Sequence, residues 1–222
     1  MTTDGAVTSS PAAAHVERLI TTVVAAWRAG ATRGDQASKY LEAAVAVVSD
    51  SPERRLSVPG DQPPCAHLDD LPKPSAVDPA AVTGALLAAR DALAWGTAYP
   101  ELAGDSRYDA FRAAYAYAEL VGPRGPIVTD RLSAFITIQG PGVLYPPHAH
   151  PAPEVYWVVA GTTQWRRGHE DWVTRPPGSF IFHRSGLPHA TRTENEPLLA
   201  LAFWTDHLDG ASVMVGDAAP RM

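Results

Sequence analysis

The second half of the chain consists of short apolar or alternating segments separated by glycine and proline, and this pattern restricts the fold most strongly. After about residue 129 the segments read LSAFITIQ, EVYWVVA, TTQWRR, DWVTR, SFIFH, HATRT and PLLALAFW, with GPG, AG, GHED, PPG and SGLP between them. Evenly spaced short strands bounded by such turns are typical of antiparallel sandwiches and barrels. We therefore expect residues 129–210 to form a mainly β barrel and residues 211–222 to form a C-terminal tail.

The region before these segments has helical periodicity. Apolar residues recur every three or four positions in residues 12–29, 40–48 and 78–95, and the last stretch opens with an Asp-Pro pair that suits an N-cap and a first helical position. A Pro- and Asp-rich stretch at 51–77 shows little periodicity and is predicted to be a linker or loop. Residues 1–128 are thus expected to be an N-terminal helical region that packs on the barrel.

Composition excludes several classes of partner. The chain has 222 residues, 18 Lys and Arg against 24 Asp and Glu, and a formal net charge of -6, without a dense basic run. Nucleic acids and anionic membranes attract clustered Lys and Arg, so neither is an expected partner. No apolar stretch approaches the ~20 residues that span a bilayer, and the N-terminus lacks the pattern of a secretory signal. The single Cys65 cannot form an internal disulfide, so we expect a cytoplasmic protein, and we consider a homodimer.

Three histidines and a glutamate carry the strongest chemical signal. His148 and His150 are spaced to share one face of a strand, and Glu154 follows four residues later, after an irregular PAP link. Imidazole and carboxylate ligands suit Fe, Mn, Zn, Co or Ni, and a further histidine from a neighbouring strand would complete the set. His189, which opens the run HATRT, meets that requirement. The sequence therefore predicts a site for one divalent transition metal.

Two tyrosines flank these ligands. Tyr145 lies five residues before His150, and Tyr156 lies two after Glu154, on the same strand face. A nearby divalent cation stabilises a phenolate and lowers the ordinary tyrosine pKa of about 10, which makes Tyr156 a candidate general base. By the same alternation, Trp157 is expected to point to the opposite face and to pack there.

The spacing of these residues resembles the cupin superfamily. Its first motif is Gly, five residues, His-x-His, three or four residues, Glu, six residues and Gly, and it is matched by Gly142, His148, His150, Glu154 and Gly161. The second motif is met in part, by Gly178, Gly186 and His189, with Arg184 and Thr193 in place of the usual proline and asparagine. The resemblance implies a single double-stranded β-helix barrel.

A narrower resemblance extends from Tyr145 to Trp204. The pattern Tyr-Pro-x-His-x-His, three residues, Glu-x-Tyr, followed by SGLPHATRT and a downstream Trp, is similar to the cupin-type dimethylsulfoniopropionate (DMSP) lyases of the DddQ and DddL types. These enzymes are carbon-sulfur lyases that cleave DMSP to dimethyl sulfide and acrylate. The resemblance implies His150, Glu154 and His189 as metal ligands, His148 as a further ligand or close neighbour, Tyr156 as the base, and Tyr145 and Trp204 as substrate-binding residues.

Other functions stay open on the sequence alone, because cupin barrels host many chemistries. One alternative is a dioxygenase or another lyase that acts on a small carboxylate, for which the same ligands would suffice. A second is a non-catalytic cupin that binds a small molecule. The two isolated histidines, His169 and His183, are interpreted as ordinary polar residues near turns, with His183 also considered for the pocket rim or a second layer around the metal.

Overall fold

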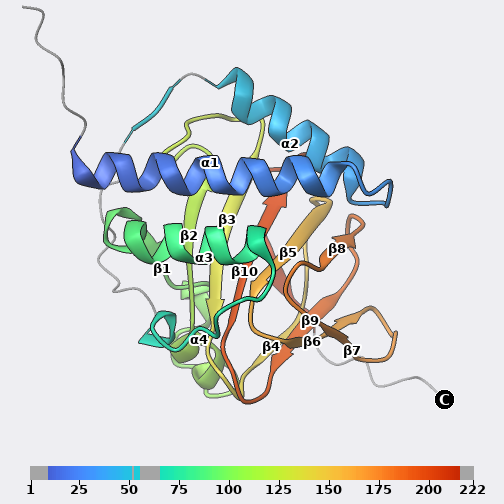
Figure 1. The fold of residues 1–222 in the computed structure, drawn as a ribbon. Helices are drawn as coiled ribbons and strands as arrows, with labels where there is room; N and C mark the ends of the chain where they lie inside the picture. Colours follow the sequence, from blue (N-terminus) through green and yellow to red (C-terminus); the bar gives the residue numbers. More distant parts are fainter. Residues whose placement is uncertain (1–9, 52, 56–65, 216–222) are drawn as a thin grey trace, which may run out of the picture.

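The computed structural model describes residues 10–51, 53–55 and 66–215 (Figure 1). Cys65 lies outside these residues. The helical elements are α1 (Pro11–Ala31), α2 (Ser38–Asp50), α3 (Val77–Ala89), α4 (Asp109–Ala114) and the 3-10 turns η1 (Ala66–Leu68), η2 (Arg90–Ala92) and η3 (Pro100–Leu102). The strands are β1 (Trp95–Gly96), β2 (Tyr115–Val121), β3 (Ser133–Gln139), β4 (Leu144–Ala149), β5 (Glu154–Ala160), β6 (Thr163–Arg167), β7 (Val173–Arg175), β8 (Phe180–His183), β9 (His189–Thr193), β10 (Leu198–Trp204) and β11 (Val213–Met214).

The strands form two antiparallel sheets. The larger sheet has the order β1-β2-β3-β10-β5-β8, and the smaller has the order β11-β4-β9-β6-β7. Their inner faces meet in a core where Trp165 of β6 packs with Tyr156 of β5 and Ile181 of β8. The expected mainly β fold, with the two-sheet arrangement of a cupin and helices at its N-terminal side, is confirmed.

Helices α1 and α3 cover the outer face of the larger sheet, and α2 packs beside α1 (Figure 1). In α1 the apolar side chains form one stripe, as the periodicity predicts, and Trp27 of this stripe packs on Phe203 of β10 with ring centroids 5.0 Å apart. Trp157 of β5 is buried in the same layer and stacks on Phe180. The predicted alternation along β5 is therefore confirmed, because Trp157 packs outward while Tyr156 faces the smaller sheet.

The element boundaries differ from the expectation in three places. The third helix ends at Ala89, and Trp95 belongs to β1, while Asp78 lies inside the helix rather than at its N-cap. The larger sheet begins ahead of residue 129, because β2 pairs with β3 along its length. Six of the seven residues of β2 are buried, so this strand lacks the alternation that marks a half-exposed strand. Within the expected tail, β11 pairs with β4.

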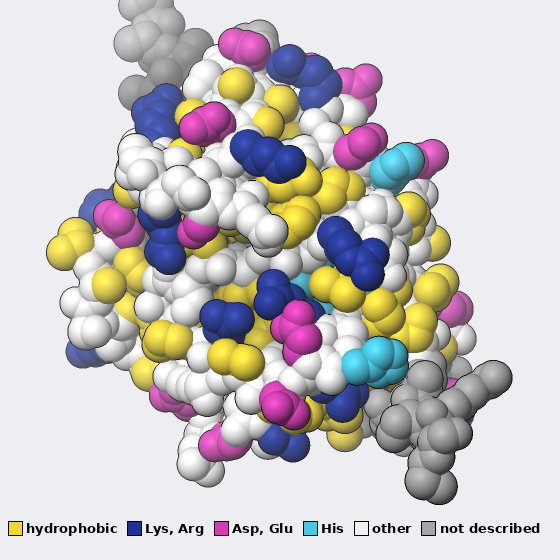
Figure 2. Space-filling model, turned by 90° about the vertical axis from the view of Figure 1, so that its right-hand side faces the viewer, with side chains coloured by type: hydrophobic (Ala, Val, Ile, Leu, Met, Phe, Trp, Pro, Cys, Tyr) yellow, Lys and Arg dark blue, Asp and Glu magenta, His cyan; other side chains and the backbone are white. Residues whose placement is uncertain are grey.

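On the face shown in Figure 2, Lys and Arg side chains are interspersed with Asp and Glu side chains. Among the described residues, no helix combines the length and the apolar character needed to cross a membrane.

Candidate metal site and substrate cavity

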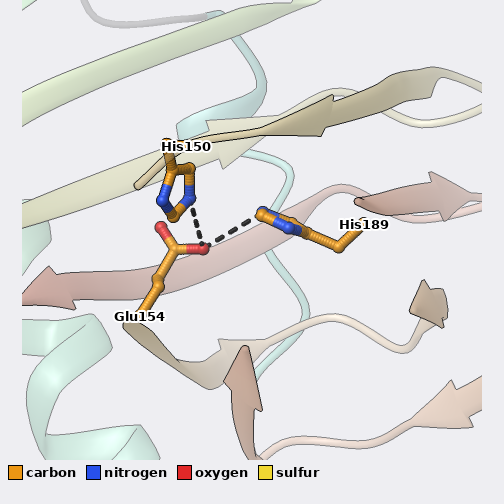
Figure 3. Close-up of side chains that lie close together, drawn as sticks. All are labelled: His150, Glu154 and His189. Carbon is orange, nitrogen blue, oxygen red and sulfur yellow. Dashed lines mark hydrogen bonds and ion pairs between the residues drawn. The ribbon is translucent and has the colours of Figure 1, made fainter. Parts of the chain in front are cut away.

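Three of the predicted ligands meet between the two sheets. His150 directly follows β4, Glu154 begins β5 and His189 begins β9, and all three side chains are buried. One ligand atom of each lies within 4.8 Å of the others. Figure 3 shows both imidazole rings pointing at the carboxylate, with Glu154 Oε2 lying 3.2 Å from His150 Nε2 and 3.1 Å from His189 Nε2.

Backbone carbonyls fix the proton positions on these imidazoles. His150 Nδ1 lies 2.9 Å from the Ala152 carbonyl, and His189 Nδ1 lies 2.9 Å from the Leu187 carbonyl. A carbonyl oxygen only accepts, so each Nδ1 carries a hydrogen and each neutral ring turns the lone pair of Nε2 toward Glu154. Within the described part of the chain, His189 Nε2 is buried without a hydrogen-bond partner.

This arrangement requires a cation. Two nitrogen lone pairs and a carboxylate cannot share a buried site without positive charge between them. A proton on His150 is one source: burial disfavours the imidazolium, but Glu154 and the Ala152 carbonyl outweigh it, and the pKa of His150 is raised. A divalent transition metal is the other source, since it binds through imidazole and carboxylate ligands of this kind. The group of His150, Glu154 and His189 could therefore hold a metal ion.

His148, the remaining predicted ligand, lies beside this group. Its ring is buried, its Nδ1 lies 3.0 Å from the Pro146 carbonyl, and its centroid is 4.1 Å from that of His189. Burial and the neighbouring His189 hold the pKa of His148 well below its usual value, so the ring stays neutral with a free Nε2 lone pair. The structure thus places His148 as a close neighbour of the three-residue group.

Glu154 is held by two further side chains. Trp204 donates its indole N–H to Oε1 at 2.8 Å, and His183 Nδ1 lies 3.1 Å from Oε2. Burial alone would disfavour the carboxylate, but its close contacts with His150, His183 and His189 hold the pKa of Glu154 well below its usual value. The interpretation of His183 as an ordinary polar residue near a turn is wrong, because its side chain is fully buried against this carboxylate.

A cavity of about 460 Å³ opens beside the group. All three predicted aromatic site residues, Tyr145, Tyr156 and Trp204, line it, together with His148, His150 and Glu154. Four more aromatic side chains complete the wall: Tyr99, Tyr115, Tyr117 and Phe135. The cavity therefore combines a potential metal site with an aromatic wall, which suits a small ligand that carries both a negative and a positive group.

The two predicted tyrosines have different surroundings. Tyr145 stacks on the ring of His148, with centroids 3.9 Å apart, and its hydroxyl hydrogen-bonds to that of Tyr99 at 2.7 Å. Tyr156 packs edge-on against Trp165. Burial, reinforced by the charge of Glu154, raises the pKa of Tyr156 well above 10. With protein groups alone this phenol is therefore neutral, and its ionisation depends on added positive charge.

Tyr99 was not predicted from the sequence. It lies just before η3 in the left-handed backbone region, with φ of 53°, which is uncommon for a bulky residue. Its hydroxyl bridges Tyr145 and Ser212, each at 2.7 Å. No local sequence pattern marks Tyr99, because its position depends on how the loop ahead of α4 crosses the cavity.

Comparisons with known proteins show the family to which the chain belongs. A sequence model of the dimethylsulfoniopropionate lyase family matches residues 35–200. The dimethylsulfoniopropionate lyase DddQ of Ruegeria pomeroyi is 35% identical over 153 residues, which cover 68% of this chain and 74% of that protein. A provisionally named DddL lyase of Cereibacter sphaeroides is 33% identical over 164 residues, which cover 72% of this chain and 66% of that protein.

The fold is shared with a solved member of the same group. The crystal structure of the Ruegeria pomeroyi DMSP lyase DddQ superposes with a TM-score of 0.71 and 27% identity, covering 93% of this chain and 98% of that one. The family match spans most of the chain and includes the ligand-bearing strands β4, β5 and β9. The chain therefore belongs to the dimethylsulfoniopropionate lyase family.

Proposed function

We propose that this protein is a metal-dependent DMSP lyase that cleaves DMSP to dimethyl sulfide and acrylate by a β-elimination begun by Tyr156. One observation carries the proposal. In a chain of this family, the Nε2 lone pairs of His150 and His189 converge with the Glu154 carboxylate at a cavity that Tyr156 lines.

His150, Glu154 and His189 would hold the ion, with His148 as a further ligand or neighbour. Fe, Zn or Mn fits this donor set best, and Co or Ni also suits it. When bound, the ion supplies a Lewis acid that holds the substrate carboxylate and acidifies the adjacent C–H. The carbonyl bonds to the Nδ1 atoms keep both imidazoles in the tautomer that metal binding needs.

Tyr156 is the proposed general base. Its ring lies 6.3 Å from that of His189, so the phenol stands at the edge of the metal group. Positive charge in that group offsets the burial and the Glu154 charge that otherwise raise the pKa of Tyr156. The phenolate then takes the α-proton of DMSP.

The electron pair of the broken C–H bond forms the C=C bond of acrylate, while the bond between Cβ and sulfur breaks. Sulfur keeps that bonding pair, so the sulfonium leaves as neutral dimethyl sulfide. No protein acid is therefore required for the leaving group, and the proton remains on Tyr156 until it passes to solvent.

The aromatic wall suits the sulfonium end of DMSP. Faces of Tyr and Trp attract a cation by about 0.5–2 kcal/mol without forming a tight ion pair. Trp204 and Phe135 contact each other edge to face, with centroids 5.8 Å apart, and both line the cavity. Tyr145 lines the same wall above His148. These side chains are the proposed substrate-binding residues.

Dimethyl sulfide release under strictly anaerobic conditions tests this function. The purified, metal-loaded protein is expected to form dimethyl sulfide and acrylate from DMSP in equal amounts without O₂. A requirement for O₂ would favour the alternative of a dioxygenase acting on a small carboxylate. Binding of DMSP without product would favour a non-catalytic cupin, and failure with every one of the five metals would contradict the proposal.

Two further proposals concern the cellular location and the oligomeric state of the enzyme. We propose a cytoplasmic enzyme, since its single cysteine is compatible with a reducing compartment. We also propose a homodimer in solution, which light scattering on the purified protein would test against a monomer mass of 23.6 kDa.

A further inference from the structure

His183 is buried at the back of the metal group and contacts two of its members. Its Nδ1 lies 3.1 Å from Glu154 Oε2, and its ring stacks on that of His189 with centroids 3.9 Å apart and an interplanar angle of 18°. The side chain has no exposed surface. The pairing of β8 with β5 sets His183 opposite Glu154, whereas His189 contacts it from β9 of the facing sheet.

Trp165 determines which nitrogen of His183 carries the hydrogen. The indole Nε1 of Trp165 lies 3.0 Å from His183 Nε2. An indole N–H only donates, so His183 Nε2 must accept. In the neutral ring the hydrogen is then on Nδ1, which donates to Glu154 Oε2. Both ring nitrogens are thus engaged, and His183 has no lone pair left for a metal.

Trp165 also contacts Tyr156, the proposed base. Trp165 packs against the ring of Tyr156 with centroids 4.9 Å apart and an interplanar angle of 64°. Trp204 holds the other carboxylate oxygen of Glu154. Each carboxylate oxygen is therefore held by one donor, Trp204 for Oε1 and His183 for Oε2, and the remaining lone pairs of the carboxylate are left for a cation.

We propose that His183, fixed by Trp165, is a positioning residue that sets the carboxylate of Glu154 and the ring of His189 for metal binding. The proposal rests on the metal site of the proposed function. Partners that orient metal ligands in this way change metal affinity by about 10- to 100-fold when they are removed. Affinity for the metal is therefore the direct measure of this role.

The test compares binding of Co²⁺ by four proteins in competition with a chelating dye. In His183→Leu the donor to Glu154 is lost, and Co²⁺ affinity is expected to fall by about 10- to 100-fold. In His183→Asn the side-chain NH₂ group occupies the place of Nδ1 and restores much of that affinity. In Trp165→Phe the tautomer is no longer fixed, so affinity falls by about 10-fold and the absorption bands of bound Co²⁺ change.

Two matched controls separate positioning from general damage. Trp157→Phe removes an indole from a buried position on the outer face of β5, and His169→Asn changes an exposed histidine. Both are expected to bind Co²⁺ within about twofold of wild type. Thermal unfolding of each metal-free protein shows which variants are folded.

Wild-type affinity and an unchanged Co²⁺ spectrum in His183→Leu would overturn the proposal, and so would equal losses in His183→Leu and His183→Asn. If His183→Leu does not fold, Trp165→Phe decides: wild-type affinity overturns the proposal, and the expected loss supports it. All of these measurements are made without DMSP. If the proteins show the predicted Co²⁺ affinities but the wild-type protein does not cleave DMSP, the proposed function is contradicted and the inference about His183 stands.

Discussion

At the residue scale, hydrogen bonds to backbone carbonyls orient three histidines as candidate metal ligands. His148, His150 and His189 each place Nδ1 about 3 Å from a carbonyl two residues away. These bonds fix the tautomer of every ring before any ion arrives, so the lone pairs of the Nε2 atoms are available. The orientation of the site therefore comes from local backbone geometry around each histidine.

The proposed base gives the first prediction. Tyr156→Phe keeps the ring that packs on Trp165 but removes the hydroxyl, so DMSP cleavage should fall by about 10²- to 10⁴-fold while metal binding is unchanged. Gas chromatography of dimethyl sulfide and a metal assay on the same sample check both points. Tyr40→Phe, on the outer side where Tyr40 stacks on Phe182, is the matched control and should keep full activity. A Tyr156→Phe protein with near-normal cleavage would show that another group removes the proton.

The sequence predicts site residues that lie within one motif better than it predicts residues that strand pairing brings to the site. His150 and Glu154 lie four residues apart, on either side of the short link between β4 and β5, and the structure brings both together with His189. The spacing of the sequence does not place His183, because its position beside Glu154 depends on the pairing of β8 with β5. Alternation along β8 was the available signal, since Ile181 and His183 share the face turned toward the inner core.

At the element scale, the turn between β5 and β6 reverses the chain immediately after the strand that carries Glu154 and Tyr156. Gly161 lies in this turn with φ of 82°, and a Cβ there would lie 2.0 Å from the Pro197 carbonyl oxygen. Only glycine satisfies both the backbone conformation and the close approach of Pro197. The last glycine of the first cupin motif is thus explained by packing of the turn against the segment that leads into β10.

Gly161→Ala tests this explanation. The substitution combines left-handed backbone strain with a clash against main chain, so the free energy of unfolding should fall by about 2 kcal/mol or more. Gly84→Ala is the matched control: Gly84 lies in α3 with nothing within 4 Å of an added Cβ, and the change should stabilise the helix by about 0.5–1 kcal/mol. Denaturant unfolding of both proteins gives the comparison, and a Gly161→Ala protein as stable as wild type would contradict the account.

Elements were predictable where they have one exposed face or where turn residues mark both of their ends. The stripe of α1 could be predicted directly because this helix has one buried and one exposed face. In β2, almost every residue is buried, so periodicity gives no signal for a strand. β5 is buried on both faces as well, but Pro153 and Gly161 bound its apolar run, whereas β2 directly follows α4 without a turn. The expected boundary at residue 129 therefore lies after β2.

At the scale of the whole molecule, the two faces of the larger sheet have different roles: the outer face packs against helices, and the inner face borders the site. Its outer face carries α1 and α3 and the core that includes Trp27 and Trp157. Its inner face, with the smaller sheet, surrounds the metal group and the aromatic cavity. Polar groups buried on the inner face, however, make the stability of the whole fold depend on pH.

The stability of the metal-free protein should decrease in acid. Burial, with the nearby His189, lowers the pKa of His183 from 6.5 to about 3. Between these values the unfolded chain binds a proton that the folded chain does not, so the free energy of unfolding falls as the pH falls, by up to about 1.4 kcal/mol per pH unit. The depressed pKa of Glu154 acts in the same direction, whereas His150, with a raised pKa, titrates above this range.

Guanidinium unfolding at a series of pH values measures this slope after the metal has been removed with a chelator. His183→Asn lacks the titrating ring and should show a shallower decline between about pH 6.5 and pH 3. An identical slope in the two proteins would mean that His183 is not held neutral in the folded state.

The central claim is that elimination of DMSP occurs at the group of His150, Glu154 and His189 with a metal bound. The most direct measurement follows dimethyl sulfide release by the anaerobic protein while the metal is removed by chelation and then titrated back. We predict that release stops on removal and returns in proportion to bound metal, reaching its maximum at one ion per chain. Undiminished release from the metal-free protein, or no release with any of Fe, Zn, Mn, Co and Ni, would contradict the account.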